Sequence, residues 1–502
     1  MEQYKTFELN FEGSRPEGSE AVVNLEAVFI NGDESKTVKG FYKGNGVYAV
    51  RFLPEKEGVY KWKVSGCVEA SGEERCVKAA DGKAHGVVRA VGTHFEYEDG
   101  TPFKSFGTTI YAMMHQEESL ISQTYETLAA APFNKVRLCV FPKHYDYNHN
   151  EPELFAFEKD ENGQWDVNRP CFAFWNHFES GILKLQEMGI QTDLILFHPY
   201  DRWGFSSLSL EQCKTYLDYL LRRFSAIPSV WWSMANEYDL MLKHPIEHWY
   251  AFEQFIVDND PYRHLLGNHN CIKYYDHSRP NITHCCVQTA WMEKAADWMR
   301  KYNKPVVYDE CCYEGNLPHN WGNISAFEMV NRFWSACTVG AYCTHGEVFL
   351  SEDEVLWWAK GGVLKGESPK RIAFLRSILE ELPGYLEEWR EERKMDEGNE
   401  EFQKTMEYFR RLRESLSEAE LDALERKDKD FRGHYEDRVF LQYLGRHCKG
   451  LLKWKLPEGH RYRVEVIDVW NMTRETVREG AGGDIEVKLP GREGMAVLAV
   501  EE

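Results

Sequence analysis

The stretch IQTDLILF (190–197) opens a pattern that decides the fold, because an amphipathic segment, YLDYLLRRF (216–224), separates it from a second strand-like run, SVWWSMAN (229–236). Parallel strands that are covered by helices on both faces read as apolar runs of this kind. Strands that alternate with helical segments indicate βαβ units and a parallel sheet. The pattern therefore predicts an α/β fold.

The same pattern recurs between residues 103 and 346. The other strand-like runs are FKSFGTTI (103–110), NKVRLCVF (134–141), RHLLGNHN (263–270), ITHCCVQT (282–289), KPVVYDE (304–310) and GAYCTHG (340–346). With the two runs quoted above they make eight, the number that closes a TIM (β/α)8 barrel. A doubly wound sheet is the competing fold, but neither GxGxxG nor GxxxxGK[ST] follows the first strand. We therefore predict the barrel.

Both flanks of the barrel read as β structure. Residues 1–88 contain short alternating strands separated by turn signals, which predicts an immunoglobulin-like β-sandwich. The predicted barrel spans residues 89–432 and includes a charged helical extension from about residue 375. Residues 433–502 return to strands and predict a second β-sandwich. Apolar residues recur at helical spacing in the extension, at Met406, Phe409, Leu412 and Leu416. A solvated helix explains them, and an interaction tail is the alternative.

Charge and cysteine content exclude several classes of protein. The net charge of −21 argues against binding to nucleic acid or to an anionic membrane surface. No stretch reaches the roughly 20 apolar residues of a membrane span, and the N-terminal MEQYKTFELNFEG lacks the plan of a signal peptide. The 13 cysteines are an odd number without metal-ligand spacing. We expect a cytoplasmic protein with free thiols and with no metal or organic cofactor.

The barrel hypothesis makes position along each strand informative, because TIM barrels place their chemistry at the carboxyl ends of the strands. Glu237 follows the fourth predicted strand and Glu310 ends the seventh, and these strands face each other across the barrel mouth. The same positional rule, together with stacking aromatics in mouth loops, selects the substrate-binding candidates His198, His269, Asn270, Gln288, His345, Glu347, Trp203, Trp291 and Trp321. Arg137 is a candidate because an unpaired arginine inside a barrel strand would be costly, and Asn236 is one because Glu237 follows it.

Two acids on opposed strands are the arrangement that glycoside hydrolysis requires. One carboxylic acid protonates the leaving oxygen, and a carboxylate attacks the anomeric carbon. The two roles need different environments, because one group must keep a proton and the other a charge. For Glu237 a purely structural pairing with an arginine is the alternative, and His198 could equally be a core histidine.

The motif WWSMANEYD (231–239) resembles the strand-four segment of the retaining (β/α)8 glycosidases known as the 4/7 superfamily, or clan A. The resemblance implies that Glu237 is the acid/base and that Asn236 binds the sugar hydroxyl next to the anomeric carbon. PVVYDE (305–310) resembles the strand-seven segment, which implies that Glu310 is the nucleophile. Arg137 and His198 match the arginine and histidine that many members place around the nucleophile.

The stretch HGVVRAVGTHFEYEDGTPFKSFGTT (85–109) is similar to the start of apiosidase-like members of that superfamily, which act on plant glycans. An N-terminal immunoglobulin-like domain and a C-terminal β-sandwich are usual in that branch. Two positions depart from the wider pattern. The strand-six segment CCVQTAW lacks the tyrosine that contacts the nucleophile in many members, and the strand-eight segment offers His345 where many have a tryptophan.

The segment KPVVYDECCYEG (304–315) carries further groups that could react. Period-two alternation places Tyr308 and Glu310 on one face of the strand and turns Asp309 toward the helices or the loop. Glu314 lies beyond the strand, where it could contact substrate. A thiol enzyme that uses Cys311 or Cys312 is an alternative, but no neighbouring residue of the segment would lower a thiol pKa.

These observations converge on a retaining glycosidase that cleaves an oligosaccharide or glycoside of plant origin. Glu310 is the expected nucleophile and Glu237 the expected acid/base. A non-catalytic glycan-binding protein on a barrel scaffold is the alternative from another class. We expect a carbohydrate as the partner, neither nucleic acid nor membrane, and a homo-oligomer remains open.

Overall fold

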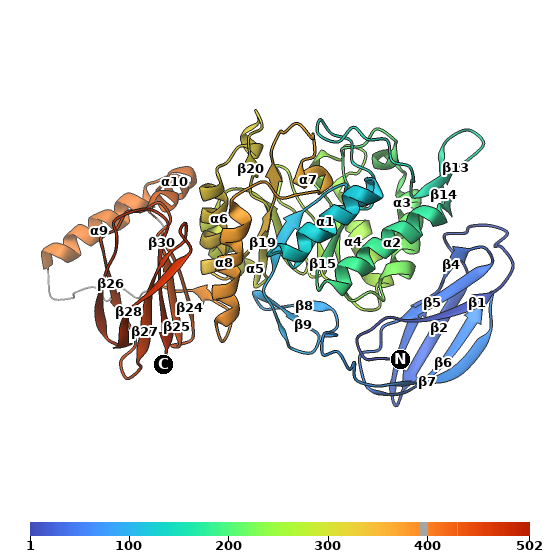
Figure 1. Ribbon diagram of the computed structural model, residues 1–502, viewed down its shortest axis with the longest axis horizontal. Coiled ribbons are helices and arrows are strands. Elements are labelled where there is room, and N and C mark those ends of the chain that lie inside the picture. Colours follow the sequence, from blue (N-terminus) through green and yellow to red (C-terminus); the bar gives the residue numbers. More distant parts are fainter. Residues whose placement is uncertain (391–399, 429) are drawn as a thin grey trace.

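The computed structural model describes residues 1–390, 400–428 and 430–502. Figure 1 shows three regions in a row: N-terminal strands at one end, a mixed helical and strand region in the middle, and C-terminal strands at the other end. The middle region contains an eight-stranded parallel sheet.

Eight parallel strands form the barrel, in the order β17-β16-β15-β12-β11-β21-β19-β18. They are β11 (Phe106–Thr109), β12 (Lys135–Cys139), β15 (Gln191–Phe197), β16 (Val230–Ala235), β17 (Leu266–Gly267), β18 (Cys285–Gln288), β19 (Val306–Glu310) and β21 (Tyr342–His345). Between β17 and β18 the backbone N–H of Thr283 donates to the carbonyl of Leu266 at 3.0 Å. The barrel is thus nearly closed, and the prediction of a TIM barrel is confirmed.

Helices surround this sheet (Figure 1). They are α1 (Glu118–Ala130), α2 (Phe172–Glu187), α3 (Leu210–Phe224), α4 (Ile246–Asn259), α5 (Ala295–Tyr302), α6 (Ala326–Thr338), α7 (Trp357–Lys360) and α8 (Ser368–Glu381). The start of α3 illustrates the local logic, because Ser209 and Gln212 form a reciprocal capping box there. Apolar side chains of the helices and strands form one large core.

The amino-terminal end of the barrel is closed by a small antiparallel sheet made of β8 (Val88–Val91), β9 (His94–Tyr97) and β10 (Pro102–Phe103). Phe95 packs there against Trp231 and Tyr342, with ring centroids 5.1 and 5.0 Å apart. Aromatic side chains thus fill the amino-terminal end of the barrel.

Two all-β regions flank the barrel, as predicted. The N-terminal region contains β1 (Phe7–Glu12), β2 (Leu25–Asn31), β3 (Glu34–Lys39), β4 (Phe41–Gly44), β5 (Val47–Phe52), β6 (Gly58–Gly66) and β7 (Ala70–Cys76). They form the antiparallel sheets β1-β5-β4 and β3-β2-β6-β7 around a shared core. Arg51 connects this region to the barrel, because its Nη2 lies 2.6 Å from Glu179 Oε1 on α2.

The C-terminal region contains a six-stranded sheet, β23-β24-β25-β30-β27-β28, and the pair β26-β29. Its strands are β23 (Glu387–Glu388), β24 (Phe431–Tyr435), β25 (Val439–Tyr443), β26 (Leu451–Lys455), β27 (Tyr462–Asp468), β28 (Thr473–Ala481), β29 (Asp484–Lys488) and β30 (Met495–Glu501). The charged extension contributes α9 (Glu400–Glu414) and α10 (Glu418–Asp428), which follow β23 in the chain. Of its apolar residues, Met406 and Phe409 are 37 % and 51 % exposed.

Strand β19 departs from regular alternation at Asp309. Val287 of β18 pairs with Tyr308 and the next residue, Gln288, pairs with Glu310, so Asp309 is an additional residue in the ladder. Such a bulge re-aims the side chains that follow it. Tyr308 faces the helices, where its hydroxyl donates to the carbonyl of Trp291 at 2.9 Å.

Two expectations for this strand are therefore wrong. Asp309 points into the barrel, where its Oδ1 lies 2.7 Å from Lys135 Nζ of β12, a strand that is not its neighbour. Glu310 does not share a face with Tyr308 but lines a cavity at the barrel mouth. Strict period-two alternation fails because the bulge adds one residue before the strand ends.

Candidate active site

A cavity of about 280 Å³ lies at the carboxyl ends of the barrel strands. Both predicted catalytic acids, Glu237 and Glu310, line it. The remaining lining residues are Tyr111, Lys143, Tyr145, Tyr200, Asn236, Cys271, Gln288, Thr289, Ala290, Cys312, Tyr313, Trp321 and Trp358. Aromatic walls around a few charged groups are typical of a site that binds a small polar ligand with apolar faces.

Glu310 ends β19 with its side chain 12 % exposed. The Tyr111 hydroxyl donates a hydrogen bond to Glu310 Oε1, and Arg137 Nη1 lies 3.7 Å from the same oxygen. Burial and the neighbouring charge of Glu237 raise the pKa of Glu310, whereas Arg137, Lys143 and the Tyr111 hydrogen bond act in the opposite direction. Glu310 is thus a buried carboxyl group whose charged form is supported by cations.

Glu237 follows β16 and has a left-handed backbone, with φ 57° and ψ 58°. This region is unfavourable for a residue with a Cβ atom. The conformation turns the side chain into the cavity, where the Tyr200 hydroxyl donates to its Oε2. Asn236 precedes it in the same wall, and its Oδ1 lies 2.7 Å from the Tyr111 hydroxyl. Among the described residues, no Lys or Arg lies within 4.0 Å of the Glu237 carboxylate oxygens.

His269 connects the two acids. The backbone N–H of Glu237 donates to His269 Nδ1 at 3.3 Å, so the ring proton resides on Nε2. Nε2 lies 3.8 Å from Glu310 Oε1. Burial, reinforced by the charge of Arg137, lowers the pKa of His269 well below its usual range, and the ring is therefore neutral. A neutral imidazole in this tautomer can orient Glu310 without adding charge.

A buried network of charges lies beneath the cavity. Lys135 Nζ is 2.7 Å from Asp309 Oδ1 and 3.2 Å from Asp193 Oδ2, and Arg137 Nε is 3.6 and 3.8 Å from the same two side chains. All four side chains are at most 3 % exposed. Lys135 and Arg137 hold the pKa of Asp309 far below its usual range, against the effect of burial. The network fixes Arg137 under Glu310.

Lys143 lies among the aromatic rings of the cavity. Its Nζ is 3.4 Å from the ring centroid of Tyr111, 4.3 Å from that of Tyr200 and 5.1 Å from that of Trp358. An ammonium group on the face of an aromatic ring is attracted by the electrons of that ring. The lysine therefore contacts both tyrosines that hold the acids.

The structure separates the predicted substrate-binding residues into three groups. Asn236, Gln288 and Trp321 line the cavity. His269 and Arg137 lie just beneath it, against Glu310. The others do not line the cavity: His198, Asn270, His345, Glu347, Trp203 and Trp291.

Those outlying residues have other partners. His198 Nε2 lies 3.2 Å from the carbonyl of Phe141. Asn270 Oδ1 accepts from the Gln288 backbone N–H at 3.1 Å, and Trp203 Nε1 donates to Glu151 at 2.9 Å.

Tyr111, Lys143 and Tyr200 line the cavity but were not among the predicted residues. Tyr111 directly follows the first predicted strand, 103–110, and the other two follow the second and third strands by two to three residues. Consistent use of the strand-end rule would have selected them. The tyrosine that is absent from strand six is matched in function by Tyr111, whose hydroxyl reaches the predicted nucleophile from strand one. Cys312, one of the two cysteines of the thiol-enzyme alternative, lines the cavity as well.

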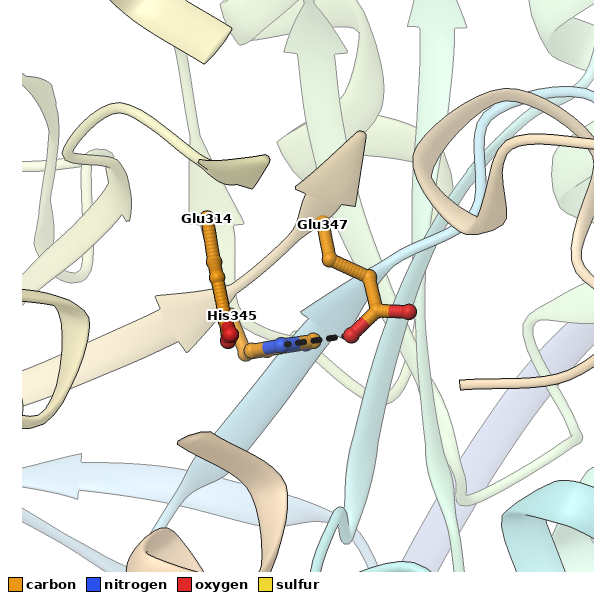
Figure 2. A group of neighbouring side chains, drawn as sticks. All are labelled: Glu314, His345 and Glu347. Atoms are coloured by element: carbon orange, nitrogen blue, oxygen red, sulfur yellow. Dashed lines mark ion pairs between the residues drawn. The ribbon is translucent and has the colours of Figure 1, made fainter. Parts of the chain in front are cut away.

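One group of side chains within the described residues could be considered for a metal ion, namely Glu314, His345 and Glu347 (Figure 2). Their possible ligand atoms lie within 4.8 Å of one another. The four carboxylate oxygens, however, already accept backbone N–H groups of residues 365–368 at the start of α8. The two carboxylates are thus occupied in capping α8, and this arrangement suits a helix cap better than a cation site.

His345 is fixed by partners other than the two glutamates. Its Nδ1 lies 3.1 Å from Thr108 Oγ1, which also accepts from Trp357 Nε1 at 2.9 Å. Its ring stacks on Phe133, with ring centroids 4.8 Å apart.

Glu347 should make the stability of the protein depend on pH. Burial raises its pKa from 4.5 to about 7. Between these pH values the folded state holds a proton that the unfolded state has lost, so stability falls as pH rises through this window and stays low above it. The free energy of unfolding of the wild type should fall by about 3 kcal/mol across this window, and we expect Glu347→Gln to remove that fall. Urea unfolding of both proteins at pH 4.5 and 8 measures this, and parallel pH dependences would contradict it.

Comparison with known protein families gives three matches. A model described as "Apiosidase-like, catalytic domain" matches residues 90–417. Two domains of unknown function, DUF5060 and DUF5605, match residues 1–66 and 429–499. Among curated proteins, none matches the sequence.

Solved structures are similar to this chain over most of its length. A crystal structure from Bacteroides vulgatus ATCC 8482, provisionally described as a glycoside hydrolase, is 33 % identical, with a TM-score of 0.87, and the match covers 100 % of this chain and 99 % of that one. A glycoside hydrolase family 5 structure from the same strain is 14 % identical, with a TM-score of 0.61 and coverage of 83 % and 94 %. The second match shows the fold alone. In the part of the chain that the structure describes, no helix is both long and apolar enough to cross a membrane.

Proposed function

Because this chain belongs to the family of apiosidase-like glycoside hydrolases, we propose that it is a retaining glycosidase with Glu310 as nucleophile and Glu237 as acid/base catalyst. The observation that carries the proposal is the meeting of two glutamates, from strands β16 and β19, in one aromatic cavity. A pair of carboxyl groups that flank one bond is the requirement of glycoside hydrolysis.

The surroundings of the two acids support this division of roles. Arg137 lies 3.7 Å from Glu310, and the charge of Lys143 also favours the ionised form of that group. A nucleophile must be ionised, so the cations suit Glu310. Glu237 instead contacts the neutral hydroxyl of Tyr200. An acid that must donate a proton suits this environment, since no arginine or lysine among the described residues pairs with it.

The proposed reaction proceeds in two displacements. Glu310 attacks the anomeric carbon while Glu237 gives its proton to the departing glycosidic oxygen, which leaves a sugar esterified to Glu310. Glu237, now a carboxylate, removes a proton from water, and the oxygen of that water attacks the anomeric carbon. The C–O bond to Glu310 breaks, the free sugar leaves, and Glu237 has regained its proton. Tyr111 and His269 hold Glu310 in line throughout.

The size and walls of the cavity indicate the form of the substrate. Its volume of about 280 Å³ is at the lower end of ligand pockets, which span about 300–1,000 Å³. We therefore propose that it accepts one terminal sugar of a glycoside or oligosaccharide. Trp321, Trp358 and Tyr313 offer flat faces for the apolar side of a sugar ring. The resemblance to apiosidase-like proteins suggests a plant glycan as the source.

The stereochemistry of the first product tests this mechanism. We expect that a panel of aryl glycosides contains a substrate, and that NMR during the first minutes shows a product with the anomeric configuration of that substrate. Two successive displacements at one carbon restore the original configuration. An inverted first product would overturn the assignment, because inversion requires Glu310 to activate water across a wider gap of about 6.5–9.5 Å.

A further inference from the structure

The buried charges around the proposed catalytic pair nearly cancel. Lys135 and Arg137 are paired with Asp193 and Asp309 beneath the cavity. The carboxyl and ammonium side chains that line the cavity are Lys143, Glu237 and Glu310. If Glu237 holds its proton and Glu310 does not, Lys143 supplies the one positive charge that balances Glu310. A site so completely buried tolerates little net charge.

Lys143 is placed for this role. It is 4 % exposed, and no described carboxylate lies within 4.0 Å of its ammonium group. It lies on the rings of Tyr111 and Tyr200, whose hydroxyl groups donate to Glu310 and Glu237 respectively. Burial lowers the pKa of Lys143, while Cys139, Glu310 and Glu237 act to raise it.

The other groups around Glu310 cannot replace this charge. Arg137 is shared with Asp309 and Asp193, and His269 is neutral for the reasons given above. Tyr313 and Tyr111 have pKa values raised well above 10 by burial, so they carry no charge either. Arg137 also favours the ionised form of Glu310, but among the described neighbours Lys143 is the cation that is not paired with Asp193 or Asp309. Its loss would therefore change the charge balance of the acid pair.

We propose that Lys143 is a positioning residue that fixes the proton count of the acid pair, so that Glu310 stays ionised while Glu237 keeps one proton. It acts through the rings of Tyr111 and Tyr200 and through its charge. This inference rests on the proposed function of the two glutamates. Without the ammonium group the pair would bind its second proton at a higher pH than in the wild type, and that proton would occupy the nucleophile.

The pH dependence of kcat/KM tests the inference. For Lys143→Met we expect the acid limb of the profile to move upward by about 1 pH unit or more, the lower end of the effect of a neighbouring opposite charge. Activity on the plateau should fall much less than activity on the acid side. Lys143→Arg keeps the charge and should restore the wild-type limb. Circular dichroism and urea unfolding confirm that each variant is folded.

Two outcomes would overturn the inference. An unchanged acid limb in Lys143→Met shows that the lysine does not set the proton count. An equal loss of kcat/KM at every pH, with KM raised, shows that it contacts the substrate instead. Failure of the proposed function is recognised separately, because Glu310→Gln would then remain active whatever Lys143 does.

Discussion

Glu310→Gln is expected to lose turnover by roughly 10⁴-fold or more, the scale on which enzymes fail when a covalent nucleophile is removed. Glutamine preserves the shape of the side chain and can still interact with the Tyr111 hydroxyl, which donates to Oε1 in the wild type. It cannot attack the anomeric carbon. Initial rates on the best aryl glycoside, compared at equal protein concentration, measure the loss. A variant with a tenth of the wild-type rate or more would end the assignment.

The fold should survive this change. Burial disfavours a charged carboxylate at this position and raises the pKa of Glu310, so a neutral amide should leave the urea midpoint unchanged or slightly higher. Glu314→Gln is the matched control, because it makes the same chemical change four residues later, outside the cavity lining. It should keep most of the wild-type turnover. Loss of activity in both variants would point to a distorted segment instead of a missing nucleophile.

Asp309→Ala should have the opposite effect and lower the stability of the barrel by about 3–5 kcal/mol, the cost of removing one partner of a buried ion pair. Asp309 accepts from Lys135 Nζ at 2.7 Å and from Thr344 Oγ1 at 2.9 Å, and is fully buried. Its removal leaves Lys135 with Asp193 alone, and Arg137 with Asp193 and Glu310. Equilibrium unfolding in urea, followed by tryptophan fluorescence, measures the difference.

The neighbouring variant provides the comparison. Asp309 and Glu310 are adjacent acids on one strand, yet we expect the first to be required for folding and the second for turnover. Asp309→Asn keeps a side chain of the same size but loses the charge, and should fall between the wild type and Asp309→Ala. An unchanged urea midpoint in Asp309→Ala would show that the buried ion pairs of Asp309 do not stabilise the barrel.

Sequence periodicity was sufficient to predict the architecture. Every one of the eight barrel strands falls inside a run that the sequence marks, because strands covered on both faces must be apolar. The order of the strands follows from the right-handed βαβ rule, which leaves little choice once the strands are counted. The positions of Glu237 and Glu310 at one cavity follow from the same count.

The lining of the cavity was less predictable, for physical reasons that particular residues show. The bulge at Asp309 depends on hydrogen-bond register between β18 and β19, which no local pattern reveals. Only the three-dimensional structure shows that the Tyr111 hydroxyl reaches Glu310 and that the Tyr200 hydroxyl reaches Glu237. His345 ends β21, but its ring binds Thr108 and stacks on Phe133. Glu347 follows the strand, but its carboxylate accepts the backbone N–H groups of Lys365 and Gly366 and does not line the cavity.

The left-handed backbone at Glu237 has a consequence for directed evolution. A non-glycine residue in this conformation costs about 1 kcal/mol or more, which the surrounding structure must offset. Glycine would adopt the same φ without that cost and would also remove a buried carboxyl group. A library selected for heat resistance alone should therefore enrich Glu237→Gly. If Glu237 is the acid/base catalyst, these variants would melt later but lose turnover. Thermal selection of this enzyme has to be paired with an activity screen.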